Sequence, residues 1–376
     1  MNRVVIALLA ISLIGCATSQ SVPTPPVGGS APSLQPNAGV VSTLSVQSKR
    51  LEDITADAQG NLYLAELDAI RKVSPDGQVT TLATVKNEVA FPGIDLETTI
   101  SNPRSIAVDR QGILYLAGYQ RTWKLTPDGR VTSLPGVPGE AATGLAVDGA
   151  GNLYMAVQGT DTIHRLGTDG KVSLYAGRHI RNQAGLGAVG AGYLDGPREQ
   201  ALFRMPSDLA VDASGNLYVA DWNNGAIRRI DATGNVTTLV GQGKDVPLPP
   251  SPAPDQPRPD MSPYLAGRIQ VKTLAVDSAG FVYAAGGDNF LRRISPTGEV
   301  NILAGDGTYC PGVAITTGGG TRSSASPSPT PDCHVDGAGA QARFDQPAAI
   351  AVDGTGRVYV LDGGDTYASR KLRKVQ

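Results

Sequence analysis

The chain contains few of the residues that usually carry chemistry. Its 376 residues include three cysteines and three histidines, and its 32 basic and 34 acidic side chains leave a net charge of −2. The lack of a basic excess argues against binding to the phosphate backbone of a nucleic acid. The sequence also has no Gly-x-Ser-x-Gly nucleophile elbow, no His-Glu-x-x-His pair and no phosphate-binding loop. We therefore assign no catalytic residue from sequence.

The N-terminal apolar run is too short to span a bilayer. It covers residues 4–14 behind the positive charge of Arg3, whereas a spanning helix needs about 20 residues. The run ends in Leu-Ile-Gly-Cys16, and this combination resembles the signal peptide and lipobox of bacterial lipoproteins. The resemblance implies that residues 1–15 are removed and that Cys16 takes the lipid. Ala17 after the cysteine implies an outer-membrane destination where the organism has one.

The next segment predicts a tether. Residues 16–39 comprise Cys16 and a stretch with five prolines, several Ser, Gly and Thr residues and few large apolar groups. Such a composition cannot bury a core and favours extended or disordered chain. We therefore expect a folded unit, residues 40–376, that stands off a membrane on this linker.

One pattern recurs six times within residues 40–376. Each copy has a short apolar strand ending in Asp, a Gly three residues later and a Tyr six residues later. The Asp residues are Asp57, Asp109, Asp148, Asp212, Asp277 and Asp353. Turn residues then separate further short strands, which gives four antiparallel strands per copy. Copies as close as 39 residues predict an all-β, six-bladed β-propeller.

The two ends of the repeat region complement each other. We place the blades near residues 50–85, 102–137, 142–177, 205–241, 271–305 and 346–376. The last copy stops after its third strand, and residues 40–46 resemble a fourth strand with no blade before it. We expect this N-terminal strand to complete the last blade and to close the ring without an open edge at the junction.

The repeat resembles a known family. The sequence Gly-Asn-Leu-Tyr-Val-Ala-Asp at 215–221, Ile-Arg-Arg-Ile at 227–230 and Val-Thr-Thr-Leu at 236–239 are similar to NHL-repeat propellers. The resemblance covers residues 40–376 and implies the propeller fold. It implies no single activity, because propellers carry unrelated functions.

Two insertions between blades end in one motif. Residues 195–206 and 336–347 both follow Asp-Gly-x-x-x-Gln-Ala-x-Phe-x-x-Pro. We expect a helical turn whose phenylalanine, Phe203 or Phe344, fills the gap beneath the loop, because long loops commonly form small apolar clusters of their own. A role in ligand binding is the alternative.

The remaining cysteines lie in the longest insertion. Cys310 and Cys333 are expected to form a disulfide outside the cytosol, and a loop of this length would gain about 3 kcal/mol from it. A metal site made by Cys333 and His334 is the alternative, although structural zinc usually has four protein ligands.

The candidate ligand site lies at the loops of the axial channel, where propellers place ligands. By resemblance, the residue after the second strand of each blade projects there, which gives Glu66, Gly118, Val157, Asp221, Gly286 and Asp362. Three carboxylates, with Asn223 and Asn224, offer oxygens to a cation such as Ca²⁺, which takes six to eight. Propellers of the gluconolactonase and paraoxonase type use such sets, but their defining motifs are absent. Solvated turn residues are the alternative.

Basic residues line the third strands. One register holds Arg71, Trp123, His164, Arg228, Arg292 and Arg373, and the next holds Lys72, Lys124, Arg165, Arg229, Arg293 and Lys374. The six repeated aspartates balance them in fixed register. We therefore expect ion pairs and hydrogen bonds between blades rather than an RNA-binding surface.

Together these patterns favour a lipid-anchored propeller of the bacterial cell envelope that faces the periplasm or the exterior. We expect a monomer that binds a protein, peptide or glycan, with no nucleic-acid partner and no cofactor beyond a calcium ion at the axial pocket. The alternative is a metal-dependent lyase or lactone hydrolase that uses Glu66, Asp221 and Asp362. An enzyme is the less favoured interpretation because no catalytic motif is present.

Overall fold

A computed structural model of the chain describes residues 39–44, 50–85, 99–118, 121–135, 141–178, 192–241, 269–307, 334–363 and 370–376. These residues belong to one compact unit that spans residues 31–376. The expected signal peptide, Cys16 as the expected lipidation site, the expected tether before Gly39 and the expected cysteine pair Cys310 and Cys333 lie outside the described residues. In the part of the chain that is described, no helix has the length and apolar character needed to cross a membrane.

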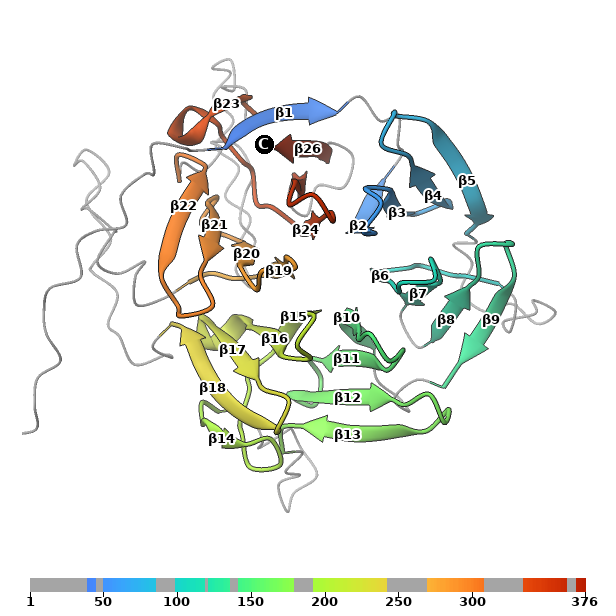
Figure 1. Ribbon diagram of the computed structural model, residues 1–376, viewed down its shortest axis with the longest axis vertical. Coiled ribbons are helices and arrows are strands. Elements are labelled where there is room, and N and C mark those ends of the chain that lie inside the picture. The colour runs from blue at the N-terminus through green and yellow to red at the C-terminus, as the bar shows by residue number, and fades with distance from the viewer. Residues whose placement is uncertain are drawn as a thin grey trace, which may run out of the picture. The chain divides into compact units, whose positions relative to one another are not determined.

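The chain forms the predicted six-bladed β-propeller (Figure 1). Blade 1 consists of β2 (Leu51–Ala56), β3 (Leu62–Glu66), β4 (Ala69–Val73) and β5 (Val79–Thr84). Blade 2 consists of β6 (Ser105–Val108), β7 (Leu114–Ala117), β8 (Thr122–Leu125) and β9 (Val131–Leu134). Blade 3 consists of β10 (Ala142–Val147), β11 (Leu153–Val157), β12 (Thr162–Leu166) and β13 (Val172–Ala176).

The other three blades follow the same plan with additions. Blade 4 consists of β15 (Pro206–Val211), β16 (Leu217–Asp221), the short 3₁₀ helix η1 (Trp222–Asn224), β17 (Ala226–Ile230) and β18 (Asn235–Val240). Blade 5 consists of β19 (Thr273–Val276), β20 (Val282–Ala285), β21 (Leu291–Ile294) and β22 (Val300–Ala304). Blade 6 consists of β24 (Ala349–Val352), β25 (Val358–Asp362), β26 (Lys371–Val375) and the N-terminal β1 (Val40–Leu44).

The spacing of Asp, Gly and Tyr in each repeat has a local cause. In blade 1, Asp57 Oδ1 accepts hydrogen bonds from the N–H groups of Gln59 and Asn61, and the Tyr63 hydroxyl donates to its Oδ2 at 3.0 Å. Gly60 turns the chain with φ of +84°, a conformation that suits glycine. The same Asp–Tyr bond forms in the other five blades. The motif is therefore a hairpin cap within one blade.

The ring closes as predicted, through β1. This strand pairs antiparallel with β26, with Val41 opposite Val375 and Leu44 opposite Leu372. The innermost strands contact one another in sequence around the axis: β2 with β6, then β10, β15, β19 and β24, and β24 with β2. Apolar clusters fill the spaces between neighbouring blades, so each sheet buries both faces against its neighbours.

The two insertions with the shared motif add a fifth, outermost strand. The segment β14 (Gly196–Pro197) pairs antiparallel with β18 of blade 4, and β23 (Gly337–Ala338) pairs with β1 of blade 6. Each then makes the expected helical turn, which in blade 6 is the 3₁₀ helix η2 (Gly339–Gln341). Phe203 and Phe344 are both fully buried and pack into the clusters between blades 3 and 4 and between blades 5 and 6. The predicted role of these phenylalanines is confirmed.

Closure by β1 predicts a contrast between two adjacent valines. Val41 is 1% exposed against Val375 and Phe344, whereas Val40 is 54% exposed. We expect Val41→Ala to lower the free energy of unfolding by about 2 kcal/mol, because it removes buried methyl groups and leaves a small cavity. Val40→Ala should change it by less than about 0.5 kcal/mol. Urea unfolding followed by circular dichroism measures both, and equal effects would show that β1 does not complete blade 6.

Candidate functional site

The axis of the propeller contains a small cavity. Its volume is about 150 Å³, and all six innermost strands line it. Most of the lining is aliphatic, with Ala107, Ala146, Ala210, Ala275 and Ala351 at matching positions. Pockets that enclose drug-sized ligands usually measure about 300–1,000 Å³, so this cavity fits only a few small atoms or waters.

Two carboxylates interrupt the aliphatic lining. Asp53 of β2 and Asp208 of β15 both face the cavity, and they come from blades that lie opposite each other in the ring. Among the described residues that line the cavity, none is basic. The exposed part of each carboxylate therefore faces this partly open cavity, and no positive side chain of the lining balances it.

Each of these carboxylates also bridges to the next blade. Asp53 accepts hydrogen bonds from its neighbour Ile54 and, at 2.8 Å, from the backbone N–H of Ile106 in blade 2. Asp208 accepts at 2.9 Å from the backbone N–H of Leu274 in blade 5 and from the Thr273 hydroxyl. The pair is thus part of the seam between innermost strands.

Burial changes the acidity of both groups. Burial, followed by the charge of Asp208, raises the pKa of Asp53 to about 8, against the opposing effect of the two backbone N–H donors. Burial likewise raises the pKa of Asp208 to about 6. The charge of Asp208 therefore adds to burial in disfavouring the charged form of Asp53.

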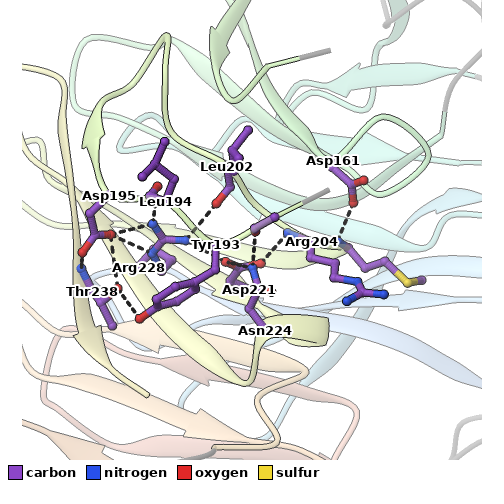
Figure 2. Close-up of polar contacts among 12 residues, drawn as sticks. Asp161, Tyr193, Leu194, Asp195, Leu202, Arg204, Asp221, Asn224, Arg228 and Thr238 are labelled. Carbon is purple, nitrogen blue, oxygen red and sulfur yellow. Dashed lines mark hydrogen bonds and ion pairs between the residues drawn. The ribbon is translucent and has the colours of Figure 1, made fainter. Parts of the chain in front are cut away.

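The carboxylates expected at the axial pocket lie elsewhere. In blade 4, Asp221 is fully buried and its Oδ2 accepts from Arg228 Nη1 at 2.9 Å and from the Asn224 side-chain amide at 2.8 Å. Its Oδ1 accepts from the Arg204 backbone N–H at 2.7 Å. Figure 2 shows this arrangement beneath the insertion. Burial raises the pKa of Asp221 to about 6, although these donors favour its charged form.

Arg228 is the hub of this arrangement. Its guanidinium is fully buried between the rings of Tyr193 and Phe203, 4.7 and 5.2 Å from their centroids. It donates to Asp195 at 2.5 Å and to the backbone carbonyls of Leu194 and Leu202. The same Asp195 accepts from the backbone N–H and hydroxyl of Thr238 on the outer strand (Figure 2). One arginine therefore joins the second strand, the third strand and the insertion.

Blade 6 repeats the hub in detail. Arg373 is fully buried, donates to Asp362 at 2.8 Å and to Asp336 at 2.9 Å, and also donates to the backbone carbonyls of Val335 and Arg343. Asp336 in turn accepts from the backbone N–H and hydroxyl of Thr43. His334 lies 2.9 Å from Asp362 through Nδ1. The carboxylate of Asp362 is therefore surrounded by cationic and polar donors.

The predicted cation site does not fit these contacts. Asp221 and Asp362 each pair with an arginine, and Glu66 lies 3.4 Å from Arg71 Nε within blade 1. Asn224 presents its amide N–H₂ to Asp221 rather than an oxygen, and the side-chain amide of Asn223 donates to Met205 Sδ at 3.2 Å. Among the described residues, no group of three His, Cys, Asp or Glu side chains could hold a metal. We derive no step through calcium.

The expected pairing between blades is also corrected. The six repeated aspartates cap their own hairpins, and Arg228 and Arg373 of the third strands pair with the carboxylate that ends the second strand of the same blade. In blade 5, Arg292 pairs at 2.7 Å with Asp288, which lies in the turn between β20 and β21. In the neighbouring register, Arg165 and Arg229 bind Asn152 and Asn216 of their own hairpins. Because apolar clusters fill the spaces between blades, these polar side chains find their partners within their own blade.

Sequence reasoning missed Asp53 and Asp208. Both occupy the position just before the apolar residue that begins each repeated strand, and that position holds Asp53, Ser105, Gly144, Asp208, Thr273 and Ala349. A charged residue within an otherwise apolar innermost strand was the sequence signal that could have identified them as residues of the axial cavity. Blade 3 has a glycine at this position, Gly144, because the backbone of Asp208 lies too close for a side chain. A Cβ at Gly144 would lie 2.5 Å from the Asp208 Cα.

Large apolar side chains are exposed beside the blade 4 hub. Trp222 is 42% exposed, Leu194 47% and Tyr193 38%. The two segments that carry them are joined by a 2.7 Å hydrogen bond from the Asn224 side chain to the Gly192 carbonyl. We call Tyr193, Leu194 and Trp222 the blade 4 patch.

Comparison with known proteins supports the repeat and the fold. The NHL repeat family matches residues 203–230, which include Asp221 and Arg228 of the blade 4 hub. Teneurin-4 of Mus musculus is 28% identical over 213 residues, which are 47% of this chain and 8% of that protein. The chain thus spans a small part of the length of the curated relatives it matches.

Two solved bacterial structures have the same fold. An auxiliary nutrient binding protein from Bacteroides thetaiotaomicron has a TM-score of 0.54 and 15% identity, over 88% of this chain and 69% of that chain. A gluconolactonase from Xanthomonas campestris has a TM-score of 0.51 and 13% identity, over 92% of this chain and 95% of that chain. Likeness at this level shows the propeller fold.

The blade 4 hub predicts a large difference between two adjacent arginines. Arg228→Met leaves the buried Asp221 without its cation and should lower the free energy of unfolding by about 3–5 kcal/mol. Arg229→Met removes a partly exposed side chain and should cost about 1 kcal/mol or less. Guanidinium unfolding of both variants tests this, and similar losses would contradict a structural role specific to Arg228.

The axial carboxylates predict an unusual dependence of stability on pH. The folded-state pKa of Asp53, about 8, lies above its ordinary value of 3.8, so between these pH values the folded protein binds more protons than the unfolded chain. Stability from this group is therefore lost as the pH rises through that window. Thermal midpoints of wild type and Asp53→Asn across this range measure the effect. The variant should gain on wild type as pH rises, and a constant difference would refute the assignment.

Proposed function

We propose that this protein is a binding scaffold of the bacterial cell envelope, anchored through lipid at Cys16 and presenting its propeller to a protein, peptide or glycan. The observation that supports this proposal is that the carboxylates at the ends of the second strands form buried ion pairs within the fold. Asp221 and Asp362 are fully buried and each pairs with a fully buried arginine. Their charge serves the fold, and it is not available for acid–base chemistry on a ligand.

The axial cavity supports the same conclusion. At about 150 Å³ it is smaller than the pockets that enclose organic ligands, which measure about 300–1,000 Å³. Recognition of a macromolecule would then take place on the outer surfaces of the blades and their insertions. Rigid scaffolds with variable loops commonly use such surfaces.

The blade 4 patch is the described surface best suited to contact a partner. Tryptophan, tyrosine and arginine are enriched where proteins bind one another tightly, and Trp222 and Tyr193 are exposed on segments fixed by the buried hub. A preformed aromatic surface loses little conformational entropy on binding. Bacterial propellers of this fold include both a nutrient binding protein and a gluconolactonase, so the choice rests on these contacts.

The location rests on the N-terminal sequence. Arg3, the apolar run of residues 4–14 and Cys16 match the features that direct a bacterial lipoprotein to the envelope. Residues 17–39 would then act as the linker between the lipid and the ring.

Affinity capture from envelope extracts of the source organism tests the binding role. Wild-type protein should retain a specific partner, and Trp222→Ala should reduce its recovery about tenfold or more, as expected for an exposed aromatic contact residue. Leu174→Ala, at a residue 50% exposed on the outer strand of blade 3, should leave recovery unchanged.

Equal recovery by all three proteins, or no specific partner, would contradict this assignment of the surface. A metal-dependent lyase or lactone hydrolase would instead be stabilised thermally by calcium or zinc. That stabilisation would disappear in a Glu66→Ala, Asp221→Ala double variant.

A further inference from the structure

The outer edges of blades 4 and 6 are each covered by an Asp-Gly segment of the same chain. In blade 4 the glycine, Gly196, pairs with Val236, and the aspartate, Asp195, binds both the backbone N–H and the hydroxyl of Thr238. In blade 6, Gly337 pairs with Val41, and Asp336 binds both donors of Thr43. Both segments run antiparallel to the strand they cover.

Three residues of the blade receive each segment. They are the carboxylate that ends the second strand, an arginine in the third strand and a threonine directly opposite that arginine in the fourth strand. Blade 4 supplies Asp221, Arg228 and Thr238. Blade 6 supplies Asp362, Arg373 and Thr43. We call this set the receiving trio.

Blade 1 carries the same trio. Glu66 is the last residue of its second strand, Arg71 lies in its third strand 3.4 Å from Glu66, and Thr81 stands opposite Arg71 in β5. The other blades differ at the threonine position. It is occupied there by Ser133 opposite Trp123, Leu174 opposite His164 and Ile302 opposite Arg292. The chemistry that holds an Asp-Gly segment is therefore present in one further blade.

Exposure distinguishes blade 1 from blades 4 and 6. Val236 and Val41 are 0% and 1% exposed where the segments cover them, whereas Val79, at the same register in β5, is 48% exposed. The side chain of Arg71 is 23% exposed, compared with 0% for Arg228 and Arg373. In the part of the chain that the structure describes, β5 is the outermost strand of its sheet. An exposed edge strand can accept a further strand from a partner.

We propose that the outer edge of blade 1 is a docking site for an extended Asp-Gly peptide segment of a partner protein. The segment adds antiparallel to β5, its glycine opposite Val79, and its aspartate binds the backbone N–H and hydroxyl of Thr81 and faces Arg71. Backbone hydrogen bonds supply affinity, and the aspartate sets the register. A small residue is required opposite Val79, as in the two filled edges. This inference rests on the proposed binding role. It names a second contact surface, apart from the blade 4 patch, and the ligand chemistry that this surface recognises.

A peptide from the chain itself is the direct probe. A fluorescent synthetic copy of residues 194–206 should bind the purified full-length protein with one-to-one stoichiometry by anisotropy titration. The edges of blades 4 and 6 already hold their own tethered segments at high effective concentration, so the added peptide should occupy blade 1. Replacing its aspartate, Asp195→Asn in the peptide, should weaken binding about tenfold, since one charge-assisted contact is lost.

Variants of the protein locate the site. Thr81→Val keeps the shape and the backbone N–H but removes the hydroxyl, so it should raise the Kd of the peptide several-fold. Val79→Lys should abolish binding, because it places a charge where an apolar contact forms. The matched control is Ser133→Val at the equivalent position of blade 2, which should leave the Kd unchanged. Circular dichroism spectra confirm that each variant is folded.

Three outcomes would overturn the proposal. The first is the absence of binding at millimolar peptide. The second is a Kd that does not change when the peptide aspartate or Thr81 is replaced. The third is a concentration-dependent dimer that Thr81→Val abolishes, which would assign the edge to a second copy of this chain. Failure of the peptide with continued partner capture through Trp222 would remove this inference and leave the binding role standing. Loss of partner capture with intact peptide binding would remove the proposed contact through Trp222 and leave the docking site on blade 1 standing.

Discussion

The buried guanidinium of Arg228, repeated by Arg373, is the interaction on which the arrangement of the blades and insertions depends. A fully buried cation requires compensating charge and hydrogen bonds, because an unpaired buried charge costs several kcal/mol. Arg228 obtains them from Asp221 of its own blade, from Asp195 of the insertion and from two backbone carbonyls. The insertion is thereby fixed as a fifth strand, and its phenylalanine is placed between two blades. The same requirement pairs Asp221 and Asp362 with buried arginines.

The fold was predictable because its signals are local and repeated. Asp, Gly and Tyr act within one hairpin, as the contacts among Asp57, Gly60 and Tyr63 show, so their spacing survives in every copy. The closing strand was predictable because residues 40–44 match a strand that blade 6 lacks. Both conclusions needed only periodicity and the rule that sheet edges must be paired.

The site was harder to predict because it depends on which way side chains face in three dimensions. A carboxylate at the end of the second strand can point to the axis or turn back to its own third strand. The amino-acid sequence around Asp221 or Asp362 does not distinguish these two orientations. Burial of the partner arginine decides between them. Asp53 and Asp208 were missed for the opposite reason: they break the repeat, and only the closed ring brings them across one cavity. Departures from a repeat therefore carry much of the information about individual blades.

Six similar blades present three kinds of outer edge. Two are covered by Asp-Gly segments, three lack the threonine that would receive one, and blade 1 has the receiving trio with an exposed β5. Residue-resolved amide hydrogen exchange tests this distinction most directly. The account predicts slow exchange at Thr238 and Thr43, whose N–H groups bind Asp195 and Asp336, and fast exchange at Thr81 in the isolated protein. Thr81 exchanging as slowly as Thr238, or all three exchanging fast, would contradict it.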